Sequence, residues 1–335
     1  SLENMPKSSR WYPGAGLYRN VHIVSTDRVH VPVWGTQVTT PYVGRDYATI
    51  RLRTDIEGLA KGDTLRLVTT IRNPRGTVVA TDTHDYKYYP GITPEQNFKV
   101  EKPALWSPET PALYTATTEI ITKGRATDTY TTRFGIRSVE VRAGEGFFLN
   151  GEKRKFKGVC NHHDLGPLGA AVNTAALRHQ LQMLKEMGAD AVRTAHNMPA
   201  PELVALCDEM GMMLMLEPFD DWGFRPKSEN GYGSLFAGWA EKDMVNMLRQ
   251  YRNNPSVVMW SIGNEVPSQW GPEGLSELKL LQDIVHREDP TRPVTCGMDQ
   301  FDAVVNNGFA AALDVAGFNY KVNRYPEAIG KLPQN

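Results

Sequence analysis

The stretch VVMWSIGNE, residues 257–265, decides the fold of the C-terminal half of this chain. Its first six residues are almost entirely apolar, which is typical of a strand buried on both faces, and the run ends abruptly at Asn264 and Glu265. Further apolar runs recur at residues 156–160, 189–194, 212–216, 293–296 and 315–320. Helical patterns lie between the runs, at residues 174–187, 201–210, 239–252 and 275–285. This alternation predicts a parallel sheet covered on both sides by helices.

Two architectures fit this alternation, an open doubly wound sheet and a closed (β/α)8 TIM barrel. The segment after the first strand, GVCNHHD at residues 158–164, contains no glycine-rich phosphate loop, which argues against the open sheet. Polar residues follow one strand after another, as a barrel active site requires. A complete barrel takes about 250 residues and eight strands. We therefore predict that residues 143–335 hold the first six strands of an incomplete, truncated TIM barrel.

The N-terminal half follows a period of two. In residues 47–56, Ala48, Ile50, Leu52 and Thr54 fall on one face and charged residues fall on the other, which predicts a half-buried strand. Similar runs occur at residues 29–34, 65–72, 77–85, 114–122 and 128–137, separated by turn-forming residues. Such short strands predict an all-β immunoglobulin-like sandwich at residues 21–142. This domain shows no catalytic pattern, so we expect a spacer or docking role for it.

The composition excludes several classes of protein. The 335 residues include 37 Lys or Arg and 38 Asp or Glu, so the net charge of −1 favours neither nucleic acid nor an anionic membrane as a partner. The longest apolar runs, such as residues 211–216, are far too short to span a bilayer. Cys160, Cys207 and Cys296 are too few and too widely spaced for a disulfide framework or a zinc site, and we expect buried free thiols.

Polar side chains gather at the ends of the predicted strands, where a barrel would bring them to one mouth. They include acids, imidazoles, amides and aromatic rings, a mixture that suits a ligand with many hydroxyl groups, such as a sugar. In chain order they are Asn161, His162, His163, Asp164, Arg193, His196, Asn197, Glu217, Asp220, Asp221, Trp222, Asn264, Glu265, Asp299, Asn319 and Tyr320.

Glu265 is the predicted catalytic residue. A carboxyl group at the hydrophobic rim of a buried strand is poorly solvated, and desolvation disfavours the anion, so we expect its pKa to be raised. A carboxylic acid that stays protonated near neutral pH can donate its proton to a departing glycosidic oxygen. Asn264 precedes Glu265 and can offer its amide to a sugar hydroxyl.

Six ordered blocks of the sequence resemble glycoside hydrolase family 2 and, within it, the β-galactosidases. The acid/base block is RNNPSV followed by WSIGNE, at residues 252–257 and 260–265. The other blocks are SRWYPGAGLYR at residues 9–19, FGIR at 134–137, FKGVCNHHD at 156–164, AVRTAHN at 191–197 and CDEMG at 207–211. The resemblance covers nearly the whole chain.

The resemblance implies a retaining mechanism with two glutamates about 5–5.5 Å apart. Glu265 matches the acid/base, whereas the family's nucleophile follows the seventh barrel strand, and no residue here matches it. Glu217 ends the third strand, next to the fourth, so we expect it to shape the sugar pocket and not to attack the sugar. The family positions near the substrate are matched by His163, Arg193, His196, Asn264 and Tyr320.

The predicted substrate-binding set is completed by Asp221, Trp222 and Asn319. Residues 1–20 resemble the join to a sugar-binding jelly-roll domain, so we interpret the chain as a fragment of a retaining exo-β-glycosidase of β-galactosidase type. Without a nucleophile, the chain alone is predicted to be inactive. Residues 217–223, EPFDDWG, lack the histidine of some magnesium-dependent galactosidases. The sequence therefore supports no magnesium site, and we predict neither a metal nor another cofactor.

Alternatives exist inside and outside this class. Family relatives that cleave β-glucuronides or β-mannosides are rivals for the substrate. A non-catalytic carbohydrate-binding module or a structural module would leave Glu265 without a chemical role. We expect a β-galactoside or related carbohydrate as partner and a homo-oligomeric parent protein. The sequence selects no compartment among the periplasm, the exterior and the cytoplasm of a bacterium-like host.

Overall fold

A computed structural model describes residues 3–12, 14, 16–332 and 334 of the chain. The chain divides into two compact units. One comprises Ser1–Asn20, Val139–Leu248 and Ser256–Asn335, and the other comprises Val21–Ser138 and Arg249–Pro255. The chain passes from one unit to the other between Asn20 and Val21, and again between Ser138 and Val139, whereas the sequence pattern placed this second boundary after Arg142.

The unit that contains Val21–Ser138 is a β-sandwich of two antiparallel sheets within the described residues. One sheet has the order β1 (Thr36–Val43), β2 (Tyr47–Thr54) and β5 (Glu95–Glu101). The other has the order β4 (Val78–Lys87), β3 (Thr64–Arg72), β6 (Tyr114–Thr122) and β7 (Arg125–Phe134). Alternate residues of both sheets are buried and form a core that includes Ile50, Leu52, Ile71, Phe98, Tyr114 and Phe134. The predicted immunoglobulin-like sandwich is confirmed.

One strand of this prediction is wrong. Residues 29–34 contain only an isolated bridge from His30 to Glu57, because the chain turns there instead of continuing. Trp34 has a φ of 58°, and the Gly35 amide donates to the Pro32 carbonyl at 2.8 Å. The sequence patterns also missed β1 and β5.

Within the described residues, the other unit is built on six parallel strands in chain order: β11 (Gly158–Asn161), β12 (Ala191–Thr194), β13 (Met213–Leu216), β14 (Val257–Asn264), β15 (Val294–Met298) and β16 (Val315–Phe318). Neighbouring strands in the sheet are also neighbours in the chain, which is the order of a TIM barrel. Every residue of β14 is buried, as its apolar sequence predicts. The sheet is a parallel half-barrel, so the predicted incomplete barrel is confirmed.

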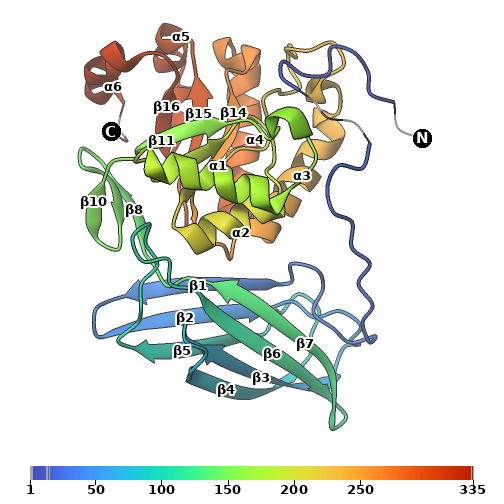
Figure 1. The fold of residues 1–335 in the computed structure, drawn as a ribbon. Helices are drawn as coiled ribbons and strands as arrows, with labels where there is room; N and C mark the ends of the chain where they lie inside the picture. The colour runs from blue at the N-terminus through green and yellow to red at the C-terminus, as the bar shows by residue number, and fades with distance from the viewer. Residues whose placement is uncertain (1–2, 13, 15, 333, 335) are drawn as a thin grey trace. The chain divides into compact units, whose positions relative to one another are not determined.

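Helices surround this sheet (Figure 1): α1 (Thr174–Glu186), α2 (Pro201–Met210), α3 (Phe236–Tyr251) and α4 (Pro272–Glu288). α2 contacts β13 and α4 contacts β14. Gly211 ends α2 in the left-handed conformation, with a φ of 70° that glycine adopts without strain. Arg193, Met215, Met259 and Ser261 line a hollow of about 430 Å³ together with Tyr325, Ala328 and Ile329 of α6 (Tyr325–Lys331).

Several smaller elements escaped the sequence patterns. They are β8 (Val139–Arg142), β9 (Gly146–Leu149), β10 (Glu152–Arg154), α5 (Phe301–Asn306), α6 (Tyr325–Lys331) and the 3-10 turns η1 (Gly166–Leu168), η2 (Tyr232–Ser234), η3 (Pro267–Trp270), η4 (Ala310–Ala312) and η5 (Val322–Arg324). Cys207 and Cys296 are buried as expected, but Cys160 is exposed. That expectation was wrong because Cys160 lies on β11, an edge strand of the sheet.

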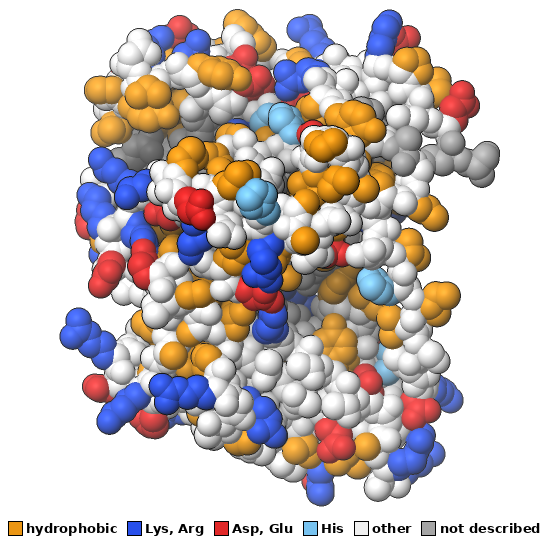
Figure 2. Space-filling view, in the orientation of Figure 1, with side chains coloured by type: hydrophobic (Ala, Val, Ile, Leu, Met, Phe, Trp, Pro, Cys, Tyr) orange, Lys and Arg blue, Asp and Glu red, His pale blue; other side chains and the backbone are white. Residues whose placement is uncertain are grey.

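The surface carries both signs of charge. Figure 2 shows basic and acidic side chains interspersed over the visible face, in keeping with the net charge of −1. Among the described helices, none combines the length and the apolar character needed to cross a bilayer.

Candidate active site

Glu217 lies directly after β13 and is the centre of a buried network. Its side chain is 0% exposed, and its Oε2 accepts hydrogen bonds from Arg193 Nε at 2.9 Å, from Arg193 Nη2 at 2.7 Å and from the Ser261 hydroxyl. His196 Nδ1 lies 2.6 Å from Oε1. Burial alone would lower the pKa of Arg193, but the Glu217 carboxylate outweighs that effect and the pKa is raised. Both carboxylate oxygens are thus occupied by partners from β12, β14 and the loop after β12.

Glu265 follows β14 immediately and is half-buried. Its backbone amide donates to the Gly297 carbonyl at 2.6 Å, and its φ is 47°, in the left-handed region that non-glycine residues seldom adopt. Asn319 Nδ2 donates to Glu265 Oε1 at 2.8 Å. The charge of Glu265, together with a hydrogen bond to it, raises the pKa of Tyr320. Tyr320 also has a left-handed backbone, with a φ of 62°.

Asn264 connects these two glutamates. Its Oδ1 accepts from Arg193 Nη2 at 2.9 Å and from Asn319 Nδ2 at 2.9 Å, while its Nδ2 donates to Asp220 Oδ1 at 2.9 Å. The amide is therefore fixed in orientation. Arg193, His196, Glu217, Asn264, Glu265, Asn319 and Tyr320 form one continuous set, as the strand ends predicted.

Asp220 adds a second charged centre at the mouth; the sequence placed it among the polar residues at the strand ends but not in the predicted substrate-binding set. It accepts from Arg10 Nε at 3.0 Å, from Arg10 Nη2 at 2.8 Å and from Lys227 Nζ at 2.8 Å. Burial works to raise the pKa of Asp220, but these two cations outweigh burial and hold it below its usual value. Lys227 Nζ also donates to the Asn264 carbonyl, at 2.5 Å.

Asp221 and Trp222 occupy a different position. Trp222 is 0% exposed and its indole N–H donates to the Ile262 carbonyl at 3.0 Å. Asp221 Oδ1 accepts from the Lys227 amide at 2.8 Å, and burial raises the pKa of Asp221. Both side chains hold the loop after β13 in place beneath the mouth.

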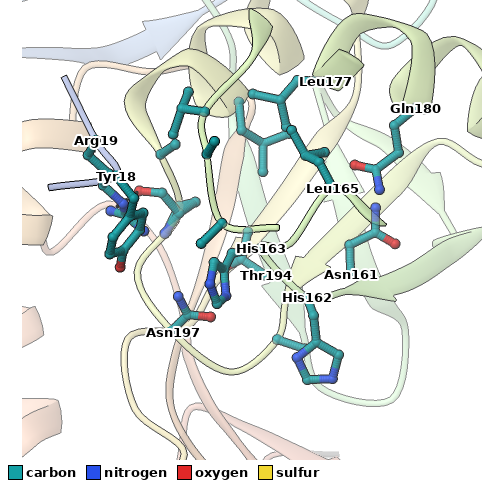
Figure 3. Close-up of a pocket in the computed structure, with 17 residues that line it drawn as sticks. Tyr18, Arg19, Asn161, His162, His163, Leu165, Leu177, Gln180, Thr194 and Asn197 are labelled. Atoms are coloured by element: carbon teal, nitrogen blue, oxygen red, sulfur yellow. Dashed lines mark hydrogen bonds between the residues drawn. The ribbon is translucent and has the colours of Figure 1, made fainter. Parts of the chain in front are cut away.

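His163 lines a separate small cavity, shown in Figure 3 with Tyr18, Arg19, Asn161 and Asn197 around it. Burial and the nearby charge of Arg19 lower the pKa of His163. The cavity volume of about 30 Å³ is the size of a water molecule and far below that of a sugar ring. The structure therefore does not bring His163 into the Glu265 cluster.

Side chains of the N-terminal segment contact residues that follow β11 and β12. The Trp11 ring lies 5.1 Å from the His162 ring and 5.7 Å from the His196 ring, between centroids. Arg19 Nη1 donates to the Pro199 carbonyl at 3.0 Å. Pro13 and Ala15 of the quoted N-terminal block lie outside the described residues. No periodic signal marks Arg10 or Trp11 as site residues, because their partners are distant in sequence.

No group of three His, Cys, Asp or Glu side chains suited to a metal ion occurs in the described part of the chain. The oxygens of Asp220 already accept from a guanidinium, an ammonium and an amide. Hydrogen bonding and ion pairing thus organise this cluster.

Comparisons with known proteins match both units. Residues 29–137 match the model described as glycosyl hydrolases family 2, and residues 139–334 match the model for the TIM barrel domain of the same family. A beta-galactosidase of Bacteroides ovatus is 39% identical over 97% of this chain. A beta-glucuronidase of Bacteroides fragilis is 27% identical over 89% of it.

A crystal structure of a glycosyl hydrolase family 2 member from Bacteroides cellulosilyticus superposes with a TM-score of 0.89, at 34% identity over 96% of this chain. The chain spans 42% of the length of that protein and 42% of the length of the Bacteroides ovatus enzyme. It spans 44% of the length of the Bacteroides fragilis enzyme.

Proposed function

Because the chain belongs to glycosyl hydrolases family 2, we propose that it is the acid/base half of a retaining exo-β-glycosidase that releases terminal β-galactose. Glu265 is the acid/base in this proposal. The observation that carries it is the placement of Glu265 at the end of a fully buried strand, with a left-handed backbone and an amide partner on its carboxylate. Strained backbone held in place by its surroundings is characteristic of functional sites.

The mechanism follows from the groups around Glu265. Its carboxylic acid donates a proton to the departing glycosidic oxygen while a second carboxylate attacks the anomeric carbon. The same residue, now a carboxylate, then removes a proton from the water that hydrolyses the glycosyl-enzyme. Asn319 orients the Glu265 carboxyl through its hydrogen bond to Oε1.

Glu217 is not the nucleophile in this proposal. Arg193, Ser261 and His196 already occupy its two oxygens, and its side chain is 0% exposed. A carboxylate in that state has no oxygen aimed at a sugar. We assign Glu217 the role of holding Arg193 and His196 in place, and we assign the nucleophile to no described residue.

β-Galactose is favoured by the 39% identity to the Bacteroides ovatus beta-galactosidase. A β-glucuronide is the second candidate, because Arg10 and Lys227 lie at the mouth and a uronate carboxylate could accept hydrogen bonds from such cations. Relatives named as beta-glucuronidases also match the chain.

A two-substrate assay tests the proposal. A protein that extends this chain with the remaining barrel strands should release nitrophenol from the aryl β-galactoside faster than from the aryl β-glucuronide, by at least about tenfold. The 335-residue chain alone should release none from either. A preference for the glucuronide would select the second candidate. Release by the chain alone at the rate of the extended protein would contradict the assignment of the nucleophile.

A further inference from the structure

A groove beside Glu265 carries two exposed aromatic rings that the mechanism above does not use. Trp270 ends η3, shortly after Glu265 in the chain, and Tyr320 follows Asn319, whose amide bonds to the Glu265 carboxylate. These two residues are 61% and 80% exposed. Both line one open groove of about 380 Å³.

The wall of the groove is polar and balanced in charge. Two acids, two cations and two amides line it: Asp299, Asp302, Lys321, Arg324, Gln300 and Asn323. Asp299 is held from both sides, because its Oδ1 accepts from Gln269 Nε2 at 2.8 Å and its Oδ2 accepts from Gln300 Nε2 at 2.7 Å. Each carboxylate oxygen has a further lone pair that can accept a hydroxyl proton. Asp299 is thus a rigid acceptor in the groove.

We propose that this groove binds the leaving group, and that the leaving group is a neutral sugar: a single hexose or the end of a longer glycan. An aromatic face packs against the C–H face of a pyranose ring, while fixed carboxylates and amides take its hydroxyls. The volume lies within the range of small-ligand sites, about 300–1,000 Å³. A flat aryl group would bury this polar wall without partners, which costs free energy.

The position of the groove fits a leaving-group site. Tyr320 hydrogen-bonds to Glu265, so the groove begins at the carboxyl group that protonates the departing oxygen. The proposal rests on the proposed function for the name of the bound group, but the groove itself is defined by Trp270, Tyr320 and Asp299.

The test uses the 335-residue chain and the indole N–H signals of its tryptophans in ¹⁵N-correlated NMR spectra. Glucose alone should shift the Trp270 signal, which Trp270→Phe identifies, and should leave the Trp239 signal unchanged. Trp239 is a matched control because it is 51% exposed but lies on α3, outside the groove. Lactose should bind more tightly than methyl β-galactoside by roughly tenfold, about 1.4 kcal/mol. Trp270→Ala should abolish that difference, and Trp239→Ala should keep it.

The outcomes separate this inference from the proposed function. No Trp270 shift with glucose or lactose, or a lactose preference that survives Trp270→Ala, overturns the groove assignment while methyl β-galactoside binding still supports the proposed function. A Trp270 shift with glucose in a chain that binds no methyl β-galactoside supports the groove, and the two-substrate assay on the extended protein then decides the cleaved sugar.

Discussion

Arg193 and Glu217 are joined by two hydrogen bonds to one carboxylate oxygen, at 2.9 and 2.7 Å, in a site where the glutamate side chain is 0% exposed. A buried pair of this kind stabilises little by itself, but breaking it leaves an uncompensated charge. The pair also positions Asn264, since Arg193 Nη2 donates to its Oδ1 as well. The Arg193–Glu217 pair therefore helps to order the candidate site.

We expect Glu217→Gln to destabilise the barrel unit by about 3 kcal/mol, because Arg193 would keep its charge without its partner. Urea unfolding followed by fluorescence would measure the loss. Glu209→Gln is the matched control, since Glu209 pairs with Arg178 at the surface and such pairs contribute about 0–1 kcal/mol. Equal effects of the two substitutions would contradict the central role of Glu217.

We expect Glu265→Gln, in a protein extended to include the remaining strands, to slow hydrolysis of lactose by about 10²–10⁴-fold, because a poor leaving group needs the proton that glutamine cannot give. An activated dinitrophenyl galactoside should be slowed far less. Steady-state kcat on both substrates checks this expectation. Glu273→Gln, in the exposed first turn of α4, should change neither rate, and unchanged lactose hydrolysis in Glu265→Gln would remove Glu265 from its role.

The stability of the folded chain should depend on pH through the protonation of Asp220. Its pKa is lowered in the folded chain, so the folded state binds this proton more weakly than the unfolded state does. The stabilisation is therefore present above the unfolded pKa of about 3.9 and is lost as the pH falls toward the folded pKa. Asp220→Asn should lower Tm at pH 7. The difference in Tm between the variant and the unmodified chain should become smaller below about pH 4. A difference in Tm that stays constant between pH 7 and pH 3 would contradict the ion pairing of Asp220.

The three thiols should differ in reactivity. Cys160 is exposed, whereas Cys207 and Cys296 are buried and burial raises the pKa of both thiols. One equivalent of thiol should therefore react quickly with Ellman's reagent in the folded chain, and the other two should react only after unfolding. Cys160→Ser should abolish the fast phase and Cys207→Ser should leave it intact. Three equivalents of equal rate would contradict the burial of Cys207 and Cys296.

The two edges of the parallel sheet should cause association. β11 and β16 each have one neighbour in the described sheet, so their outer backbone groups can pair with another chain. We expect light scattering to give a mass above the 37.4 kDa of one chain, rising with concentration. A monomer at all concentrations, with a single sharp melting transition, would contradict this expectation.

Local periodicity was enough to predict the architecture. Runs such as residues 257–262 and the alternation in residues 47–56 carry their burial pattern in adjacent residues, and chain order predicted strand order because parallel β/α units follow one another. The same logic placed Glu217, Asn264, Glu265 and Asn319 together, since each directly follows a strand.

Other features were set by contacts between residues far apart in the chain, which no local pattern encodes. Arg10 meets Asp220 across 210 residues, and Tyr18 and Arg19 close the cavity around His163. Trp222 follows a strand as Glu217 does, yet it is fully buried because its indole finds a carbonyl partner on β14.

The sequence by itself determined the two folds and the glutamate at the end of β14, because burial period and strand order are local properties of the chain. Only the tertiary structure decided which polar side chains share a site. Their hydrogen bonds and ion pairs depend on distances that the closing sheet creates, and the sequence does not list those distances.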